Sequence, residues 1–282
     1  MPSKKVIKRR FTSVTTTKKI VKAMNMVAAS KLQRDKARLM ACRPFYQSAK
    51  GIIDQLVIRG DAAKHPFLRP REVSHTAYLV ITANRGLCGS YNAELLAAAL
   101  AHMGNGKGVK IITVGSRGHD FFKRRGMTVL NRYDDALDAA FYEDAERIGN
   151  DIASLYAAGE VDAVYVAYTR FESVLTHTAR VDRLLPIGDG AEMEYAYETM
   201  KYDPDISTYL EHVIPIYLSA FIQNALIESS ACEQSARMVS MDAAVNNASD
   251  IIAKLTRVYK RRRQTEITQE LSELVGGMSI ID

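Results

Sequence analysis

The chain has 282 residues, of which 47% are hydrophobic and 25% are charged, an ordinary composition for a soluble protein of one or two domains. No apolar run in the sequence approaches the roughly 20 residues needed to span a bilayer. The three cysteines are far apart and occur in no CxxC or Cys/His ligand pattern. We therefore expect no disulfide framework, no metal site and a reducing compartment.

The formal net charge of +6 is unevenly distributed along the chain. Residues 1–57 carry fourteen lysines and arginines against two aspartates, a net charge of +12, so the other 225 residues sum to −6. Such a basic segment suggests an anionic partner surface, although much of the charge can be the solvated face of a helix. An acidic protein surface explains it as well as nucleic acid does, and no DNA-binding motif is present.

The first 56 residues carry an apolar seam that repeats every 3.5 residues, which is typical of a coiled coil rather than of a helix on a globular core. Only Lys18, Asn25 and Asp35 interrupt its apolar character. A helix of this length would run on the order of 80 Å, so its partner must be equally long. The seam positions are Ile7, Phe11, Val14, Lys18, Val21, Asn25, Ala28, Leu32, Asp35, Leu39, Cys42, Tyr46, Ala49, Ile53 and Leu56.

The N-terminal residues resemble no secretory signal, because they lead into charged helix without an apolar core region. They are basic and rich in threonine, as transit peptides are. The heptad seam begins at once, however, and a disposable leader would not need one. We therefore expect residues 1–57 to form the first long helix of the folded protein.

After residue 57, glycines and prolines mark a loop, and strands then alternate with helices. Such alternation implies βαβ crossovers and a mostly parallel sheet, and hence a Rossmann-like α/β domain at about 73–205 between the two terminal helices. We expect strands at 76–83, 109–114, 127–131, 163–169, 176–185 and 195–202, and helices at 91–103, 119–125 and 141–158.

A glycine turn at 84–90 follows the first strand, where Rossmann-type sheets bind phosphates. GxGxxG and GxxxxGK[ST] are both absent, and a tight strand-to-helix turn needs glycines with or without a ligand. Cys88 in this turn could be a nucleophile, with His102, His119 or His177 brought close by the fold. A small buried residue is the preferred interpretation of Cys88.

The segment 207–282 is predicted to be the second long helix. Ser207 offers an N-cap, and Pro215 predicts a break or kink near Ile214. No glycine or proline follows until residue 276. The apolar seam changes phase at the basic stretch 260–263. It comprises Met241, Ala244, Ala248, Ile251, Leu255 and Val258, and then Ile267, Leu271, Leu274, Met278 and Ile281.

The two long helices are expected to pair antiparallel, as a left-handed coiled coil, because a compact insert joins them. Small residues at 28–30 and 243–248 would let them approach closely. Beyond the start of the first helix, the second should project alone. Its apolar tip, 274–281, then needs cover from other chains.

Four segments together resemble the gamma subunit of F-type ATP synthase, and the resemblance covers essentially the whole chain. They are KKIVKAMNMVAASKL at 18–32, RGLCGSYN at 85–92, EQSARMVSMDAA at 233–244 and RQTEITQEL at 263–271. The resemblance implies a rotating central stalk without catalytic residues or cofactor of its own. Its helix pair would stand within a hexamer of alpha and beta subunits, and its foot would rest on the c-ring beside the epsilon subunit.

The resemblance also implies roles for individual residues. Arg263, Gln264 and Thr268 match the site that catches a beta-subunit loop, where the planar guanidinium of arginine can grip carboxylates in two places. Lys22 and Met24 match the helix face near the beta lever, and Tyr202 and Asp203 match the foot region. The residues that match the apolar bearing at the top of the hexamer are Ile267, Leu271, Leu274 and Met278.

This sequence departs from the family pattern at Lys260, where asparagine is common, and Arg261 and Arg262 make the stretch unusually basic. The cysteine-pair insert of redox-controlled chloroplast forms is absent. Without an obvious transit peptide, the expected location is the cytoplasmic face of a bacterial membrane, with the matrix side of the mitochondrial inner membrane as the alternative. Two other hypotheses remain open: an α/β enzyme that binds a nucleotide at the glycine turn, and a coiled coil that binds nucleic acid.

Overall fold

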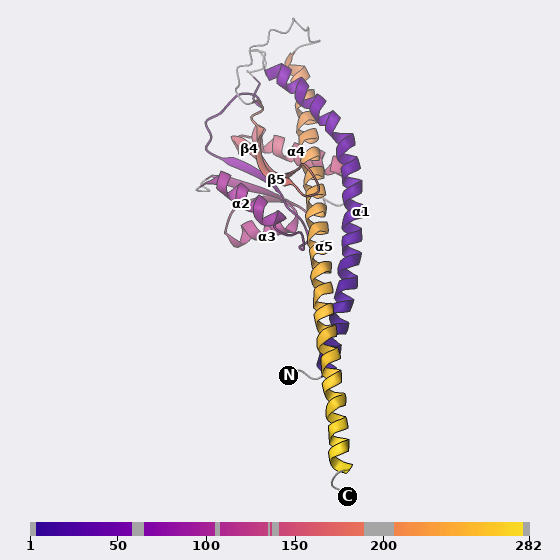
Figure 1. Cartoon of the computed structure of the whole chain (residues 1–282). Helices are drawn as coiled ribbons and strands as arrows, with labels where there is room; N and C mark the ends of the chain where they lie inside the picture. Colours follow the sequence, from indigo (N-terminus) through magenta and orange to yellow (C-terminus); the bar gives the residue numbers. More distant parts are fainter. Residues whose placement is uncertain are drawn as a thin grey trace. The chain divides into compact units, whose positions relative to one another are not determined.

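The computed structural model describes residues 4–57, 65–104, 108–134, 136, 141–188 and 206–278. Two compact units divide the chain: the stalk unit, Met1–Ala28 with Arg237–Asp282, and the sheet unit, Ala29–Ala236. The described elements are α1 (Lys4–Val57), β1 (Thr76–Ile81), α2 (Tyr91–Met103), β2 (Val109–Val114), α3 (Ser116–Arg124), β3 (Val129–Tyr133), α4 (Phe141–Ala157), β4 (Ala163–Phe171), β5 (His177–Leu185) and α5 (Ile206–Met278) (Figure 1). Long helices at both ends of the chain and an α/β segment between them confirm the predicted fold class.

The sheet unit contains a five-stranded sheet in the order β3-β2-β1-β4-β5. β1 pairs in parallel with β2 and β4, and β2 pairs in parallel with β3. β5 alone among these strands runs antiparallel, because it follows β4 through the short connection 172–176. The prediction of a mostly parallel sheet is confirmed. The strand expected at 195–202 lies outside the described residues.

Both faces of the sheet are covered, as its alternating side chains show. Tyr78 and Val80 of β1 point into a core formed with α2 and α3. Ala77, Leu79 and Ile81 point the other way, into the larger core formed with α4, α5 and the C-terminal part of α1. Alternation along a strand therefore divides one buried strand between two hydrophobic layers.

The predicted seam of α1 is confirmed. In the sheet unit its positions are buried or half-buried throughout, from Leu32 to Leu56. In the stalk unit Ile7 and Ala28 are buried, and Phe11 is the most exposed seam residue at 37%. Pro44 lies within α1 without ending it.

Of the break or kink predicted near Ile214, the break does not occur, because α5 runs without interruption from Ile206 to Met278 with Pro215 inside it. Pro215 and Glu211 are both exposed, so water can reach the carbonyl that the proline leaves without an N–H partner. Ser207 lies inside the helix rather than at its N-cap. One 18-residue window of α5 has a mean hydropathy of 1.3, but 67% of that window is buried within the structure, as in a core helix.

The predicted seam of α5 needs a second correction in the stalk unit. Ile251 and Val258 are 40% and 49% exposed. Ile252, Thr256 and Tyr259 are half-buried instead. A polar residue can occupy such a position here because the Thr256 hydroxyl donates a 2.8 Å hydrogen bond to the carbonyl of Ile252 in its own helix.

Candidate partner-contact surface and the glycine turn

Within the stalk unit, α1 and α5 pair antiparallel. The Asn25 amide donates a 3.3 Å hydrogen bond to the Met238 carbonyl, and Lys4 Nζ lies 3.5 Å from Glu266. Between these pairs, Ile7 and Phe11 share an apolar pocket of about 250 Å³ with Thr256 and Tyr259. Residue numbers on α5 rise as those on α1 fall, so the segment of α5 after Glu266 extends past the first residue described in α1.

That segment carries apolar side chains that this chain leaves exposed. Ile267, Leu271 and Leu274 are 45%, 57% and 67% exposed. Their spacing of four and three residues aligns them in one stripe along the helix. These three residues are among those predicted to form the bearing, and that role stays a prediction. Met278, the fourth predicted bearing residue, ends the helix, and its side chain lies outside those described.

The predicted catch residues lie on the exposed surface just before and within this segment. Arg263 and Gln264 are exposed, and the Thr268 hydroxyl donates a 2.9 Å hydrogen bond to the Gln264 carbonyl. Gln264 and Thr268 share a polar groove that does not include Arg263 among its lining residues. That groove has a volume of about 560 Å³ and is lined by Arg261, Gln264, Thr265, Thr268, Gln269 and Ser272.

The two residues predicted near the beta lever differ in exposure. Lys22 is exposed, whereas Met24 is half-buried on α1 of the stalk unit. Ile20 and Met26 are 57% and 67% exposed on the same helix. The foot residues Tyr202 and Asp203 lie outside the described residues.

The glycine turn after β1 is held by its own chain. Leu87 and Gly89 have φ angles of 64° and 58°. The Asn92 side chain accepts a 2.9 Å hydrogen bond from the Ala83 N–H and donates one of 3.3 Å to Cys88 Sγ. The left-handed backbone at Gly89 thus gives this glycine of the turn a structural reason that involves no ligand.

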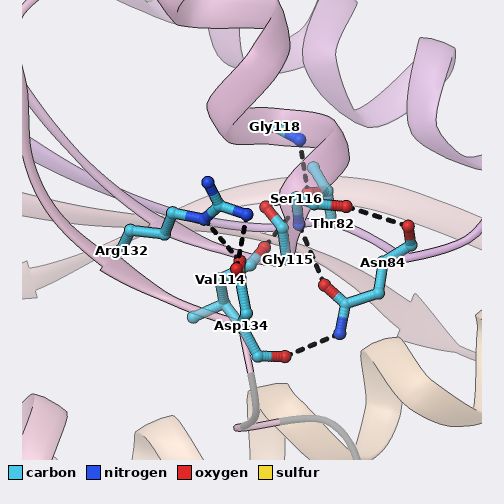
Figure 2. A network of polar contacts seen from close by, with 8 residues as sticks. All are labelled: Thr82, Asn84, Val114, Gly115, Ser116, Gly118, Arg132 and Asp134. Carbon is cyan, nitrogen blue, oxygen red and sulfur yellow. Dashed lines mark hydrogen bonds and ion pairs between the residues drawn. The ribbon is translucent and has the colours of Figure 1, made fainter.

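The N-terminus of α3, a second place where an anion could bind beside the sheet, is also closed by the chain itself (Figure 2). The Asn84 side chain accepts a 2.9 Å hydrogen bond from the Ser116 N–H, and the Thr82 hydroxyl accepts one of 2.8 Å from the Gly118 N–H. The Arg117 N–H bonds to the Ala83 carbonyl at 3.3 Å. These donors are the groups a phosphate would use, so the site offers little to a nucleotide.

The same network makes two glycines necessary. A Cβ on Gly115, whose φ is 88°, would lie 2.1 Å from the Thr82 carbonyl oxygen. One on Gly118 would lie 2.8 Å from the Thr82 hydroxyl oxygen. Asn84 also donates a 2.6 Å hydrogen bond to the Asp134 carbonyl, which ties the turn to the end of β3.

Cys88 is only 2% exposed, which confirms the preferred interpretation as a buried residue. It belongs to a small core with Ala83, Tyr91, Cys232 and Ala236. Of the histidines considered as its partners, His102 bonds through Nδ1 to the Tyr78 hydroxyl at 2.9 Å. The crevice where a doubly wound sheet binds its ligands is therefore occupied by residues of α5.

Sequence reasoning missed the polar character of α5 in the sheet unit. From Tyr217 to Ala236 every residue except Gln223 is buried, including Glu228, Ser229, Ser230 and Ser235. The Ser229 hydroxyl accepts a 3.4 Å hydrogen bond from the Thr169 N–H, and the Ser230 hydroxyl donates one of 2.7 Å to Asp35. The run of small or polar residues at 229–235, which fits no amphipathic pattern, was the available signal.

The fold and this surface define a class: a doubly wound α/β unit in the middle of the chain and two long terminal helices, which pair antiparallel in a stalk unit where the second helix extends past the first. Comparison with known proteins agrees, since the family model described as ATP synthase matches residues 3–281. The chain is 39% identical to an ATP synthase gamma chain of Alkaliphilus metalliredigens over 277 residues, which is 96% of each chain. It is 36% identical to that of Pelotomaculum thermopropionicum over the full length of both.

Solved structures show the same fold at low sequence identity. A chain of the Euglena gracilis mitochondrial ATP synthase, in a structure of its OSCP, F1 and c-ring, has a TM-score of 0.71 at 18% identity and covers 99% of this chain and 94% of its own. A chain from the central stalk and c-ring of the Tetrahymena thermophila enzyme has a TM-score of 0.62 at 22% identity and covers 80% and 99%. The protein belongs to the ATP synthase gamma chain family.

Proposed function

We propose that this chain is the rotating central stalk of an F-type ATP synthase, which couples ion flow through a membrane c-ring to ATP synthesis or hydrolysis on beta subunits. Each angle of an asymmetric shaft would favour a different conformation of each catalytic site, so the coupling is mechanical. The chain would perform no chemistry itself and would need no cofactor. Its partners would be the alpha and beta subunits, the epsilon subunit and the c-ring, with one copy in each complex.

The exposed apolar stripe at Ile267, Leu271 and Leu274 is the observation that carries this proposal. Exposing such a stripe to water is unfavourable, at roughly 25 cal/mol for each Å² of apolar surface. The stripe lies on the part of α5 beyond Glu266, where pairing with the described part of α1 has ended. A sleeve formed by the alpha and beta subunits would cover it while leaving the helix free to turn.

The location follows from the same assembly. We propose a peripheral position on the membrane, reached only through the c-ring, at the cytoplasmic face of a bacterial membrane or at the matrix side of the mitochondrial inner membrane. Tyr202 and Asp203 are proposed to contact the c-ring and epsilon subunit at the foot.

The catch residues provide the first test of the proposal. Arg263→Ala with Gln264→Ala removes one charge-assisted and one neutral donor from the exposed face, so coupled ATP synthesis in the assembled complex should fall roughly tenfold if about 1.4 kcal/mol of contact is lost. Arg257→Ala with Asn247→Ala, exposed on the paired part of α5, is the matched control. Unchanged synthesis and hydrolysis in the catch variant, or equal losses in both, would contradict the assignment.

Met24 provides the second test. It is half-buried on α1, so Met24→Lys places a charge at the edge of the helix pair, beside an already basic face. We expect less ATP formed for each ion that crosses the membrane, at a nearly normal yield of assembled complex. Lys22→Met, which removes a charge from an exposed position, is the companion variant. An unchanged ratio of ATP to ions in Met24→Lys would remove this residue from the coupling face.

A further inference from the structure

One buried carboxyl group joins three elements of the sheet unit. Glu228 of α5 is 3% exposed. Its Oε1 lies 3.1 Å from the Arg43 guanidinium of α1, and its Oε2 accepts a 3.4 Å hydrogen bond from the backbone N–H of Phe171, the last residue of β4. A single side chain of α5 thus contacts both the other long helix and the sheet.

Neighbouring contacts hold the same end of β4 against α5. Cys232 Sγ donates a 3.5 Å hydrogen bond to the Thr169 carbonyl, and the Thr169 N–H donates to Ser229. The Ser235 hydroxyl donates to the Val174 carbonyl in the turn that leads to β5. These bonds join α5 to β4 and to the turn that follows it, whereas Glu228 joins α5 to both β4 and α1.

Charge distinguishes Glu228 from the hydroxyl and thiol groups beside it. Hydrogen bonds to a charged group are stronger than neutral ones, and a buried carboxyl group that loses a partner is costly to leave unsatisfied. The Arg43 side chain is 44% exposed, so it can remain solvated while it bonds to Glu228. Glu228 is therefore the contact whose loss should most loosen the junction between the helices and the sheet.

We propose that Glu228 is a positioning residue that fixes the angle of the helix pair against the α/β sheet, with Arg43 and the Phe171 backbone as its two anchors. The inference rests on the proposed function, because a rotor must carry torque between its foot and its shaft. In the sheet unit that torque passes between β4 and the helices. Glu228 makes this junction stiff.

The test measures the stiffness of the junction within the assembled complex. A rod-shaped optical probe is attached at Glu146→Cys, an exposed position of α4, in a Cys42→Ser background, and its angular variance is recorded while hydrolysis pauses. Glu228→Gln keeps the size of the side chain but loses its charge and one of its two acceptor oxygens, so one of the two anchors is lost and the variance should rise roughly twofold. Arg43→Gln should give a smaller rise, and the double variant should not exceed Glu228→Gln.

Lys50→Gln is the matched control, since Lys50 forms an exposed ion pair with Asp54 on the same helix at 2.9 Å. A variance in Glu228→Gln and Arg43→Gln equal to that of the control overturns the inference. If Glu228→Gln fails to assemble, Arg43→Gln decides, because its side chain is half in solvent and should not disturb folding. Failure of the unsubstituted chain to rotate with the complex would instead overturn the proposed function.

Discussion

The helix α5 has two environments that reverse the usual placement of side chains. In the sheet unit, polar residues such as Glu228, Ser229 and Ser235 are buried. In the stalk unit, apolar residues such as Leu271 and Leu274 are exposed. These three polar groups have hydrogen-bond partners in the chain, so they cost little. The exposed apolar groups have no such compensation among the described residues.

This difference separates what the chain does for itself from what it needs from partners. The sheet unit closes its own crevice and gives Glu228, Ser229 and Ser235 hydrogen-bond partners within the chain, and this part of α5 acts as a core helix. In the stalk unit α5 has one seam against α1 and then a projecting end. An exposed apolar stripe of this kind marks a surface that another protein can cover. Substitutions in the two environments should therefore affect different measurements.

The largest expected difference concerns two leucines of the same helix. Leu226 is fully buried in the sheet unit, whereas Leu271 is 57% exposed in the stalk unit. Leu226→Ala should lower the free energy of unfolding by about 2–5 kcal/mol, because it leaves a cavity in the core. Leu271→Ala should change it by less than about 0.5 kcal/mol. Urea unfolding of the full chain measures both values.

The assembled complex should reverse this order. In the complex, Leu271→Ala should weaken the contact between the partner subunits and the exposed end of α5. Leu226→Ala should act only by lowering the stability of the folded chain. Equal losses of stability in the free chain would show that the tip of α5 is covered by the chain itself, and would remove the basis for the comparison.

A smaller difference is expected between two serines of α5. Ser235 is fully buried and donates to the Val174 carbonyl of another segment, whereas Ser249 donates to Val245 one turn back in its own helix at 2.8 Å. Ser235→Ala should cost about 1–3 kcal/mol because it removes a hydrogen bond that a fully buried hydroxyl donates to another segment. Ser249→Ala should be neutral or slightly stabilising, since alanine is the better helix former. Thermal unfolding of both variants tests the difference, and a neutral Ser235→Ala would mean that water replaces the hydroxyl.

The sequence was sufficient to predict the fold in those segments where a single repeating pattern of apolar residues or of elements dominated. The 3.5-residue seam of α1 predicted its buried positions because the helix has one partner for much of its length, and the α/β alternation predicted the sheet because its strands are buried on both faces. It was insufficient at Ile251 and Val258, which are apolar but face away from the seam. Periodicity cannot distinguish an apolar residue that faces α1 from one that this chain leaves exposed.

The candidate functional residues also divide into those that the sequence could suggest and those that only the structure shows. Arg263, Gln264 and Thr268 were placed by resemblance alone, and their exposed positions agree with a surface that binds a partner without testing it. Glu228 gave no signal by periodicity, because its importance depends on Arg43 and Phe171, which are distant in sequence. A residue whose role depends on contacts between distant segments becomes visible only when the fold brings those segments together.

The smallest expected effect concerns Asp35, a buried acid in the α1 seam of the sheet unit. Burial raises the pKa of this carboxyl above its ordinary value of 3.8, against the lowering influence of the Ser230 hydroxyl and of the Arg38 and Lys31 charges. The folded state therefore binds the proton more tightly than the unfolded state does. The contribution of Asp35 to the free energy of unfolding should fall as the pH rises from 3.8 through the raised pKa.

Asp35→Asn removes this titration and keeps an oxygen that can accept from Ser230. The variant should be more stable than the parent chain at pH 7, by less than the two effects above. The advantage should disappear below pH 3.8, where the parent carboxyl is neutral in both states. Urea midpoints at several pH values measure it, with the exposed Asp54→Asn as control. A difference that does not vary with pH would show that Asp35 contributes through its hydrogen bonds alone, and that the helix pair tolerates its charge because Arg38, 3.4 Å away, offsets the burial.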